Sequence, residues 1–166
     1  MSQENVEVVR LATKPRDGED MVPIIRETVE GIADWADTDA VVAAIANDPM
    51  VLPMHPEIEW DASALGLFGV AHGFYGLAVF WRDWVATWES YIYEMREYRD
   101  LGVWVLTIND SRARGRGAIP VEAPVFQIWK VRDGKIVIVR LFGSEAEALK
   151  AVGLAKGTTG VPERRL

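Results

Sequence analysis

Cysteine is absent from the 166-residue chain, and histidine occurs only at His55 and His72. A chain without cysteine forms no disulfide, offers no thiolate nucleophile and binds no metal through sulfur. Two histidines without cysteine also cannot make a typical zinc site. The sequence therefore predicts no metal centre. It also suits a reducing compartment, so we expect a cytoplasmic protein.

Basic charge and long hydrophobic runs are scarce as well. The chain has 18 Lys and Arg against 25 Asp and Glu, a net charge of −7, whereas a nucleic-acid-binding protein needs a basic face. The longest apolar stretch, 65–81, is interrupted by several glycines and His72, and it is too short for a membrane span. The first ten residues lack the apolar segment of a signal peptide. We expect neither nucleic acid nor a membrane as a partner.

Motifs that mark several common chemistries are missing too. The GxSxG turn of serine hydrolases does not occur, and neither do the GxGxxG and GxxxxGK[ST] loops that bind nucleotide phosphates. We therefore expect a protein that works without a cofactor.

Tryptophan, in contrast, is abundant, with seven residues in the chain. The segment Phe74–Trp88 places Trp81, Trp84 and Trp88 on one stripe at helical spacing, together with apolar neighbours. The spacing predicts a helix over 74–88. A tryptophan-rich helix next to a curved sheet can form the wall of an apolar pocket.

Periodicity and capping residues outline the remaining elements. They predict helices over 2–12, 21–36 and 40–46, with a polar loop over 13–20. Asp20 is the expected cap of the second helix, and Asp37-Thr38-Asp39 starts the third. Alternating segments predict strands over 57–61, 90–98, 103–117, 121–132 and 135–142. The last two strands are joined by Asp133-Gly134, a strong hairpin signal, and a capping box at Ser144 opens a final helix that ends at Gly153.

This order of elements predicts an α+β fold, with helices on one face of a curved antiparallel or mixed sheet. The length suits one domain. We expect that domain to span residues 1–154, followed by a polar tail over 155–166.

Several stretches of the sequence resemble the SnoaL-like polyketide cyclase family, within the superfamily named after nuclear transport factor two. The matching stretches are MSQENVEVVR, HPEIEWDA (55–62), FWRDWVATW, RGRG (114–117), FQIWKVRDGKIVIV (126–139) and EAEALKAVGL (145–154). The resemblance implies a cone-shaped α+β barrel of the cystatin or SnoaL type, with a pocket inside it and often a homodimer through the sheet. The superfamily includes isomerases, cyclases, dehydratases, hydrolases and non-catalytic binding domains, so the resemblance does not select a reaction.

The chain departs from the family at two places. Residues 13–30 form a segment inserted relative to the family. Near the end of the last strand, where relatives often carry an acid, a tyrosine and an aspartate, this chain has Arg140, Phe142 and Ser144.

Three residues are candidates for acid–base chemistry. His72 lies in a glycine-flanked loop and Asp61 ends a short strand, so each could exchange protons with a ligand if it faced the pocket. Arg140, on an otherwise apolar face, could stabilise negative charge on a ligand or pair with a Glu. Each also has a structural reading: His72 as a hydrogen-bonding loop residue, Asp61 as a solvated strand edge and Arg140 in an ion pair.

Other residues are candidates for holding a ligand. Aromatic contacts are expected from Trp60, Trp81, Trp84, Trp88, Trp129 and Phe142, although the tryptophans of the helix could equally be core. Gln127 shares a strand face with Trp129 and could supply a polar donor. Arg114, in the alternating stretch 112–117, could bind an anion if it pointed inward, although an outward orientation is favoured.

The sequence supports three functional hypotheses. In the first, the protein holds an apolar cyclic or polyketide-like molecule and catalyses its isomerisation, cyclisation, dehydration or hydrolysis by proton transfer. In the second, it is a ligand carrier or sensor without turnover. In the third, it is a dimeric interaction module whose cone is filled by its own side chains. A buried unpaired titratable group in an open cavity would favour the first, an almost wholly apolar and aromatic cavity the second, and a cavity below about 300 Å³ the third.

Overall fold

The computed structural model describes residues 2–66, 68–117 and 120–154. Its α-helices are α1 (Ser2–Thr13), α2 (Met21–Glu30), α3 (Thr38–Ala46), α4 (Gly73–Thr87) and α5 (Glu145–Ala151), and its 3₁₀ turns are η1 (Lys14–Arg16) and η2 (Ser63–Leu65). Its strands are β1 (Met54–Asp61), β2 (Val70–His72), β3 (Trp88–Leu101), β4 (Trp104–Gly115), β5 (Val121–Arg132) and β6 (Lys135–Phe142). The expected tail, 155–166, lies outside the described residues.

The strands form one mixed sheet in the order β2-β1-β6-β5-β4-β3. Strands β3 to β6 form an antiparallel meander, whereas β1 runs parallel to β6. The register between β3 and β4 shifts at Met95/Glu97. Such an irregularity increases the twist of the strands and bends them, which lets these long strands curve around the helices.

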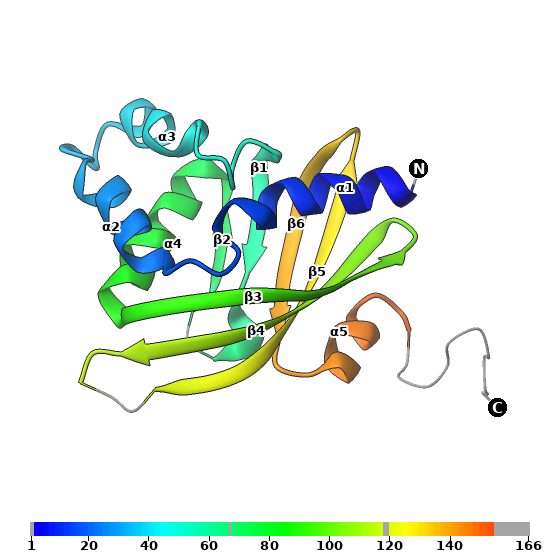
Figure 1. The fold of residues 1–166 in the computed structure, drawn as a ribbon. Coiled ribbons are helices and arrows are strands. Elements are labelled where there is room, and N and C mark those ends of the chain that lie inside the picture. The colour runs from blue at the N-terminus through cyan, green and yellow to red at the C-terminus, as the bar shows by residue number, and fades with distance from the viewer. Residues whose placement is uncertain (1, 67, 118–119, 155–166) are drawn as a thin grey trace.

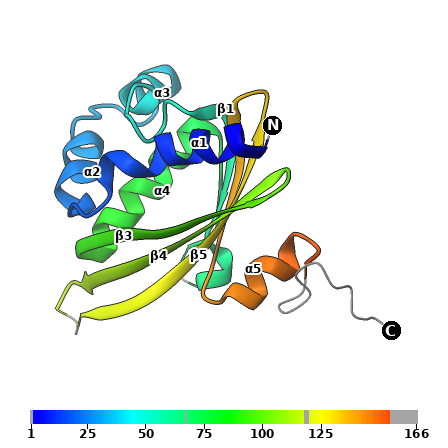
Figure 2. The same cartoon turned by 45° about the vertical axis from the view of Figure 1, so that its right-hand side comes forward.

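The curved sheet separates two apolar layers. Figure 2 shows α1 to α4 on one side of the sheet and α5 on the other. The main core lies between the first four helices and the concave face of the sheet. A smaller cluster, including Leu106, Ile128 and Leu149, lies under α5 on the convex face. The predicted α+β class, with helices against a curved mixed sheet, is confirmed.

The predicted caps and hairpin are also present. Asp20, Asp37 and Ser144 each accept a backbone N–H in the first turn of the helix that follows. Asp133 and Gly134 both have positive φ, 52° and 77°, as a tight hairpin turn requires. These local signals depend on neighbouring residues only, which is why the sequence reveals them.

The polar loop expected over 13–20 is partly wrong, because Lys14–Arg16 forms a 3₁₀ turn and Arg16 is buried. Its guanidinium makes two hydrogen bonds to the carboxylate of Asp48, with N–O distances of 3.0 and 2.7 Å. This ion pair ties the segment before α2 to the turn after α3. The tryptophan helix also ends one residue early, so Trp88 begins β3.

The segment after this turn covers the outer edge of β3. Asp17 accepts the backbone N–H of Met95, and Asp20 accepts that of Tyr91. Gly18 donates its own N–H to the carbonyl of Tyr93. Edge strands with free backbone groups invite pairing with other chains, so these contacts protect the sheet.

Candidate functional site

A cavity of about 90 Å³ lies between the helices and the concave face of the sheet. Four tryptophans form much of its wall: Trp81 and Trp84 from α4, Trp60 from β1 and Trp129 from β5. The rings of Trp60 and Trp129 meet edge to face with centroids 6.2 Å apart. The predicted aromatic wall therefore exists and is built from three different elements.

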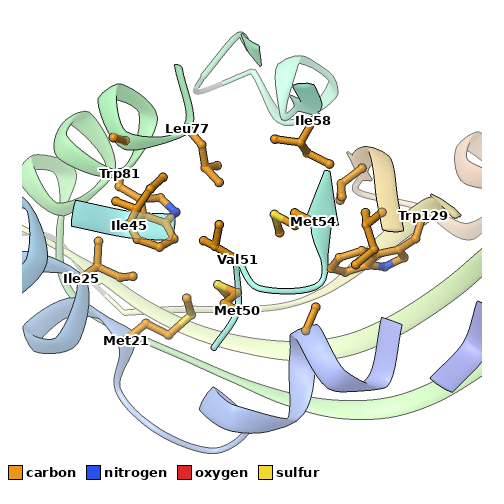
Figure 3. Packing of buried hydrophobic residues seen from close by; sticks show 14 of the residues in the cluster. Met21, Ile25, Ile45, Met50, Val51, Met54, Ile58, Leu77, Trp81 and Trp129 are labelled. Atoms are coloured by element: carbon orange, nitrogen blue, oxygen red, sulfur yellow. The ribbon is translucent and has the colours of Figure 1, made fainter. Parts of the chain in front are cut away.

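Two methionines complete the wall on the side of the helices. Met21 comes from α2 and Met50 from the turn after α3, and both side chains are nearly buried. In Figure 3, Met50 lies between Trp81 and Trp129. Methionine side chains are flexible and adapt to irregular space, so this part of the wall can rearrange around a ligand.

The sheet side of the cavity carries a chain of buried polar groups. The indole Nε1 of Trp129 donates to Thr107 Oγ1 at 2.9 Å, and Thr107 Oγ1 donates to Gln127 Oε1 at 3.1 Å. Asn109 Nδ2 donates to the same Gln127 oxygen at 3.2 Å. The side chains alternate along neighbouring strands β4 and β5, so all of them point to the concave face.

The chain of polar groups continues to β3. Ser111 Oγ donates to Asn109 Oδ1 at 2.8 Å, and the Tyr91 hydroxyl donates to Ser111 Oγ at 3.2 Å. Burial raises the pKa of Tyr91 above its ordinary value, although the hydrogen bond to Ser111 opposes this shift. The phenol of Tyr91 is therefore neutral at physiological pH.

Tyr93 is the second phenol in the cavity wall. Its hydroxyl donates to the backbone carbonyl of Thr13 at the end of α1. Burial is the largest cause that raises its pKa, and the nearby charge of Asp17 adds to it. Tyr93 therefore links the sheet to α1 and stays protonated, so it cannot serve as a base near neutral pH.

Five of the residues predicted from the sequence come together at this cavity. They are Trp60, Trp81, Trp84, Gln127 and Trp129. Trp88 does not line the cavity, but its ring contacts that of Tyr91, which does, at 5.6 Å between centroids.

The two predicted proton-transfer residues lie elsewhere. The Asp61 carboxylate accepts the backbone N–H of Ser63 at 2.9 Å and closes a turn outside the cavity. His72 is exposed on β2 and lies with His55 and Glu59 in a groove on the outer surface of the sheet. The expectation that His72 and Asp61 face the cavity is therefore wrong, because short strand β2 and the turn after β1 direct both side chains away from it.

Arg140, Arg114 and Phe142 are on the convex side of the sheet. Arg140 Nη2 lies 3.8 Å from Glu59 Oε2, so the ion-pair alternative describes it better than a role toward a ligand. Arg114 has 55% of its side chain exposed and lies 3.9 Å from Glu89. Phe142 packs against the cluster under α5. Strand alternation points all three outward, which agrees with the outward orientation favoured for Arg114 and corrects the expected ligand contacts of Arg140 and Phe142.

Sequence reasoning missed Asn109, which lines the cavity, and also Thr107 and Ser111, whose hydroxyls hydrogen-bond to the lining residues Gln127 and Asn109. Thr107, Asn109 and Ser111 alternate with Leu106, Ile108 and Asp110 in β4, and this alternation was the available signal. It shows that the three polar residues share a face, but it does not show that this face is buried. The contributions of Thr13, Met21 and Met50 come from distant segments and leave no local signal.

The structure contains neither a cluster suited to a metal nor a membrane-spanning helix in the part that is described. Within residues 2–66, 68–117 and 120–154, no three His, Asp or Glu side chains are placed so that they could hold a metal ion. None of the helices in these ranges is long and apolar enough to cross a bilayer.

No protein-family model and no curated protein matches the sequence. Solved structures do match the fold. TerC, crystallised with polyporic acid, is 17% identical and aligns over 72% of this chain and 98% of its own, with a TM-score of 0.54. An NTF2-like protein from Burkholderia thailandensis is 21% identical over 71% of this chain and 96% of its own, with a TM-score of 0.52.

A third structure comes from Catenulispora acidiphila and has a ketosteroid isomerase-like fold in complex with trimethylamine. It is 16% identical over 80% of this chain and 94% of its own, with a TM-score of 0.52. These similarities show that the chain has the NTF2-like fold, as the sequence resemblance implied. At such identities the shared property is the fold, and the function has to be argued from the cavity.

Proposed function

We propose that this protein binds a compact, largely apolar ring compound in the cavity and acts as a carrier or sensor without converting it. The observation that carries this proposal is the composition of the wall. Among the described residues, the cavity is lined by aromatic, aliphatic and uncharged polar side chains, without Asp, Glu, His, Lys or Arg. Proton transfer near neutral pH needs a group that titrates there, and the pKa values of Tyr91 and Tyr93 are both raised.

Proteins of the same fold give this proposal independent support. TerC was crystallised with polyporic acid, and the Catenulispora acidiphila protein is in complex with trimethylamine. Small molecules thus bind to proteins that share this architecture. The same fold also carries isomerases and cyclases, so the non-catalytic reading rests on the residues in this wall and not on the fold.

The size of the cavity restricts the ligand. A volume of about 90 Å³ is well below the 300–1,000 Å³ of pockets for drug-sized molecules. By size alone the cavity meets the criterion for the interaction module, whereas its aromatic and uncharged wall meets the criterion for a carrier, and the proposal rests on the wall. A polyketide-like ligand, as the sequence resemblance suggests, would require Met21 and Met50 to move aside. A ligand of about one small ring is therefore the better match.

Binding can be tested with xenon and benzene, which enter small apolar cavities. We expect both to shift the indole N–H resonances of Trp60 and Trp129 in nitrogen-15 NMR spectra. Val125→Phe places a ring in the cavity wall and should abolish these shifts, whereas Arg114→Gln on the convex face should not change them.

Unchanged indole resonances at saturating benzene and at high xenon pressure would reject the proposal in favour of a cone filled by its own side chains. Whether His72 and Asp61 contribute to ligand binding in the cavity is tested by His72→Gln and Asp61→Asn. We expect both variants to bind benzene like the unmodified protein, because neither side chain lines the cavity.

A homodimer through the sheet remains a prediction of the sequence resemblance. The apolar part of the convex face is covered by α5. Beyond it, β3 and β4 present exposed charged side chains, among them Arg96 and Asp110, which lie 3.5 Å apart. A dimer on this face would thus be polar, and sedimentation at low and high salt would detect it as a salt-sensitive association.

A further inference from the structure

The hydrogen bonds in the cavity wall have a fixed direction. An indole N–H only donates, so Thr107 Oγ1 must accept from Trp129. The remaining hydrogen of Thr107 then needs an acceptor, and Gln127 Oε1 provides it. Turning the Gln127 amide around would put a second donor opposite Thr107 and leave the threonine hydrogen without an acceptor.

The direction of these hydrogen bonds decides which end of the Gln127 side-chain amide is left for a ligand. Its Oε1 accepts from both Thr107 and Asn109. Its Nε2 carries two hydrogens that have no partner among the residues the structure describes, and the residue is 91% buried in the cavity wall. Gln127 therefore offers the cavity a hydrogen-bond donor and not an acceptor.

A second donor in the same wall is also unused. The indole Nε1 of Trp60 is buried and has no hydrogen-bond partner in the described structure. By contrast, the hydroxyl hydrogens of Tyr91 and Tyr93 are already given to Ser111 and to the Thr13 carbonyl. A buried N–H group without an acceptor, as in Trp60, is costly and uncommon in native proteins, and the Gln127 amide adds two hydrogens without a partner among the described residues.

We propose that the cavity selects ring compounds whose polar end is a hydrogen-bond acceptor, such as a carbonyl oxygen, and that Gln127 is the residue that makes this selection. This inference rests on the proposed function, because it names the class of ligand for the same cavity. A carbonyl oxygen has two lone pairs and no hydrogen, so it complements the unpartnered N–H groups of Gln127. An ammonium group would bring further donors to the same place and bind poorly.

Three probes of similar shape test the selection: cyclopentanone, methylenecyclopentane and cyclopentylamine, which is protonated at neutral pH. Methylenecyclopentane replaces the ketone oxygen with a CH₂ group and keeps the ring. Dissociation constants are measured by nitrogen-15 NMR, with the indole resonances reporting occupancy and the Gln127 side-chain amide reporting the hydrogen bond. We expect cyclopentanone to shift the Gln127 amide and methylenecyclopentane to leave it in place.

Variants separate the role of the amide from damage to the wall. Gln127→Met keeps the length of the side chain and removes the donor, so the preference for ketone over alkene should fall by roughly three- to tenfold, the value of one hydrogen bond. Thr107→Ser keeps the hydroxyl that fixes the Gln127 amide but alters the wall beside it, so it should retain that preference within about twofold. Cyclopentylammonium should bind at least about tenfold more weakly than the ketone.

The outcomes distinguish this inference from the proposed function. If ketone and alkene both bind and Gln127→Met does not change their ratio, the selection by Gln127 is refuted while ligand binding stands. If Thr107→Ser loses the preference as fully as Gln127→Met, the effect is structural and the inference again fails. If none of the three probes binds to the unmodified protein, the proposed function fails and the inference fails with it.

Discussion

Removing the charge of Asp48 should destabilise the protein strongly. Asp48 and Arg16 form a two-pronged ion pair, and each side chain is only 8% exposed. The hydrogen bond to Asp48 is the largest cause that raises the pKa of Arg16, so the guanidinium stays charged at any pH of interest. Asp48→Asn therefore leaves a buried cation without its counter-charge.

The expected loss is about 3–5 kcal/mol, as for other buried pairs that lose one partner. Domains of this kind have a total stability of about 5–15 kcal/mol, so the loss is a large part of the whole. With a urea dependence of about 2 kcal/mol per molar, the unfolding midpoint should fall by roughly 1.5–2.5 M. Urea titration followed by tryptophan fluorescence measures this shift directly.

Two controls make the result specific to burial. Arg114→Gln removes a cation that is 55% exposed and 3.9 Å from Glu89, so it should cost no more than about 1 kcal/mol. The double variant Arg16→Met with Asp48→Leu removes both charges and should recover most of the loss. A residual cost of about 1 kcal/mol should remain, because the Met50 N–H loses Asp48 as its acceptor. A loss below about 1 kcal/mol for Asp48→Asn would refute the reasoning.

Three further predictions concern the cavity wall and the covered edge of β3. Met50→Ala should cost about 2–5 kcal/mol in urea unfolding and allow naphthalene to bind, as detected by indole NMR shifts; exclusion of naphthalene from this variant would contradict the role of Met50 as a wall of the cavity. Because burial raises the pKa of Tyr93, the unfolded state alone releases this proton above about pH 10, so stability should fall there as pH rises. Tyr93→Phe should flatten that fall in urea titrations at alkaline pH, and an unaltered slope would contradict the assignment. Asp20→Ala removes both the cap of α2 and the acceptor for the Tyr91 N–H, so it should cost about 1–3 kcal/mol, against a negligible effect for Asp39→Ala on exposed α3 surface.

Local signals explain why much of the fold is predictable from the sequence. The caps at Asp20 and Ser144 and the turn at Asp133-Gly134 each depend on residues within a few positions, and all three are confirmed. The stripe containing Trp81 and the shared face of Gln127 and Trp129 follow from helical and strand periodicity. Periodicity places a residue on a face of its element, and the order of elements then indicates the layers.

The remaining errors come from contacts between distant segments. Arg16 is expected in a solvated loop because its partner, Asp48, lies 32 residues away. Arg140 alternates with Ile138, which lines the outer groove, and Phe142, which packs against the α5 cluster, so its strand face is apolar without facing the cavity. Both faces of β6 carry apolar residues, and a pattern within one strand cannot tell which of two apolar faces lies toward the cavity.

At the cavity, the structure departs from close packing and from the pairing of buried polar groups. A cavity of about 90 Å³ costs on the order of 2 kcal/mol at 24 cal/mol per Å³. Trp60 adds a buried N–H without an acceptor in the same wall. Two other buried nitrogens, on Trp88 and Arg140, also have no partner in the described structure. Neither residue lines the cavity. Well-packed domains keep such combined costs mainly at functional positions. The coincidence of an aromatic wall, unfilled volume and unused donors therefore favours a ligand that supplies both the missing packing and the missing acceptor.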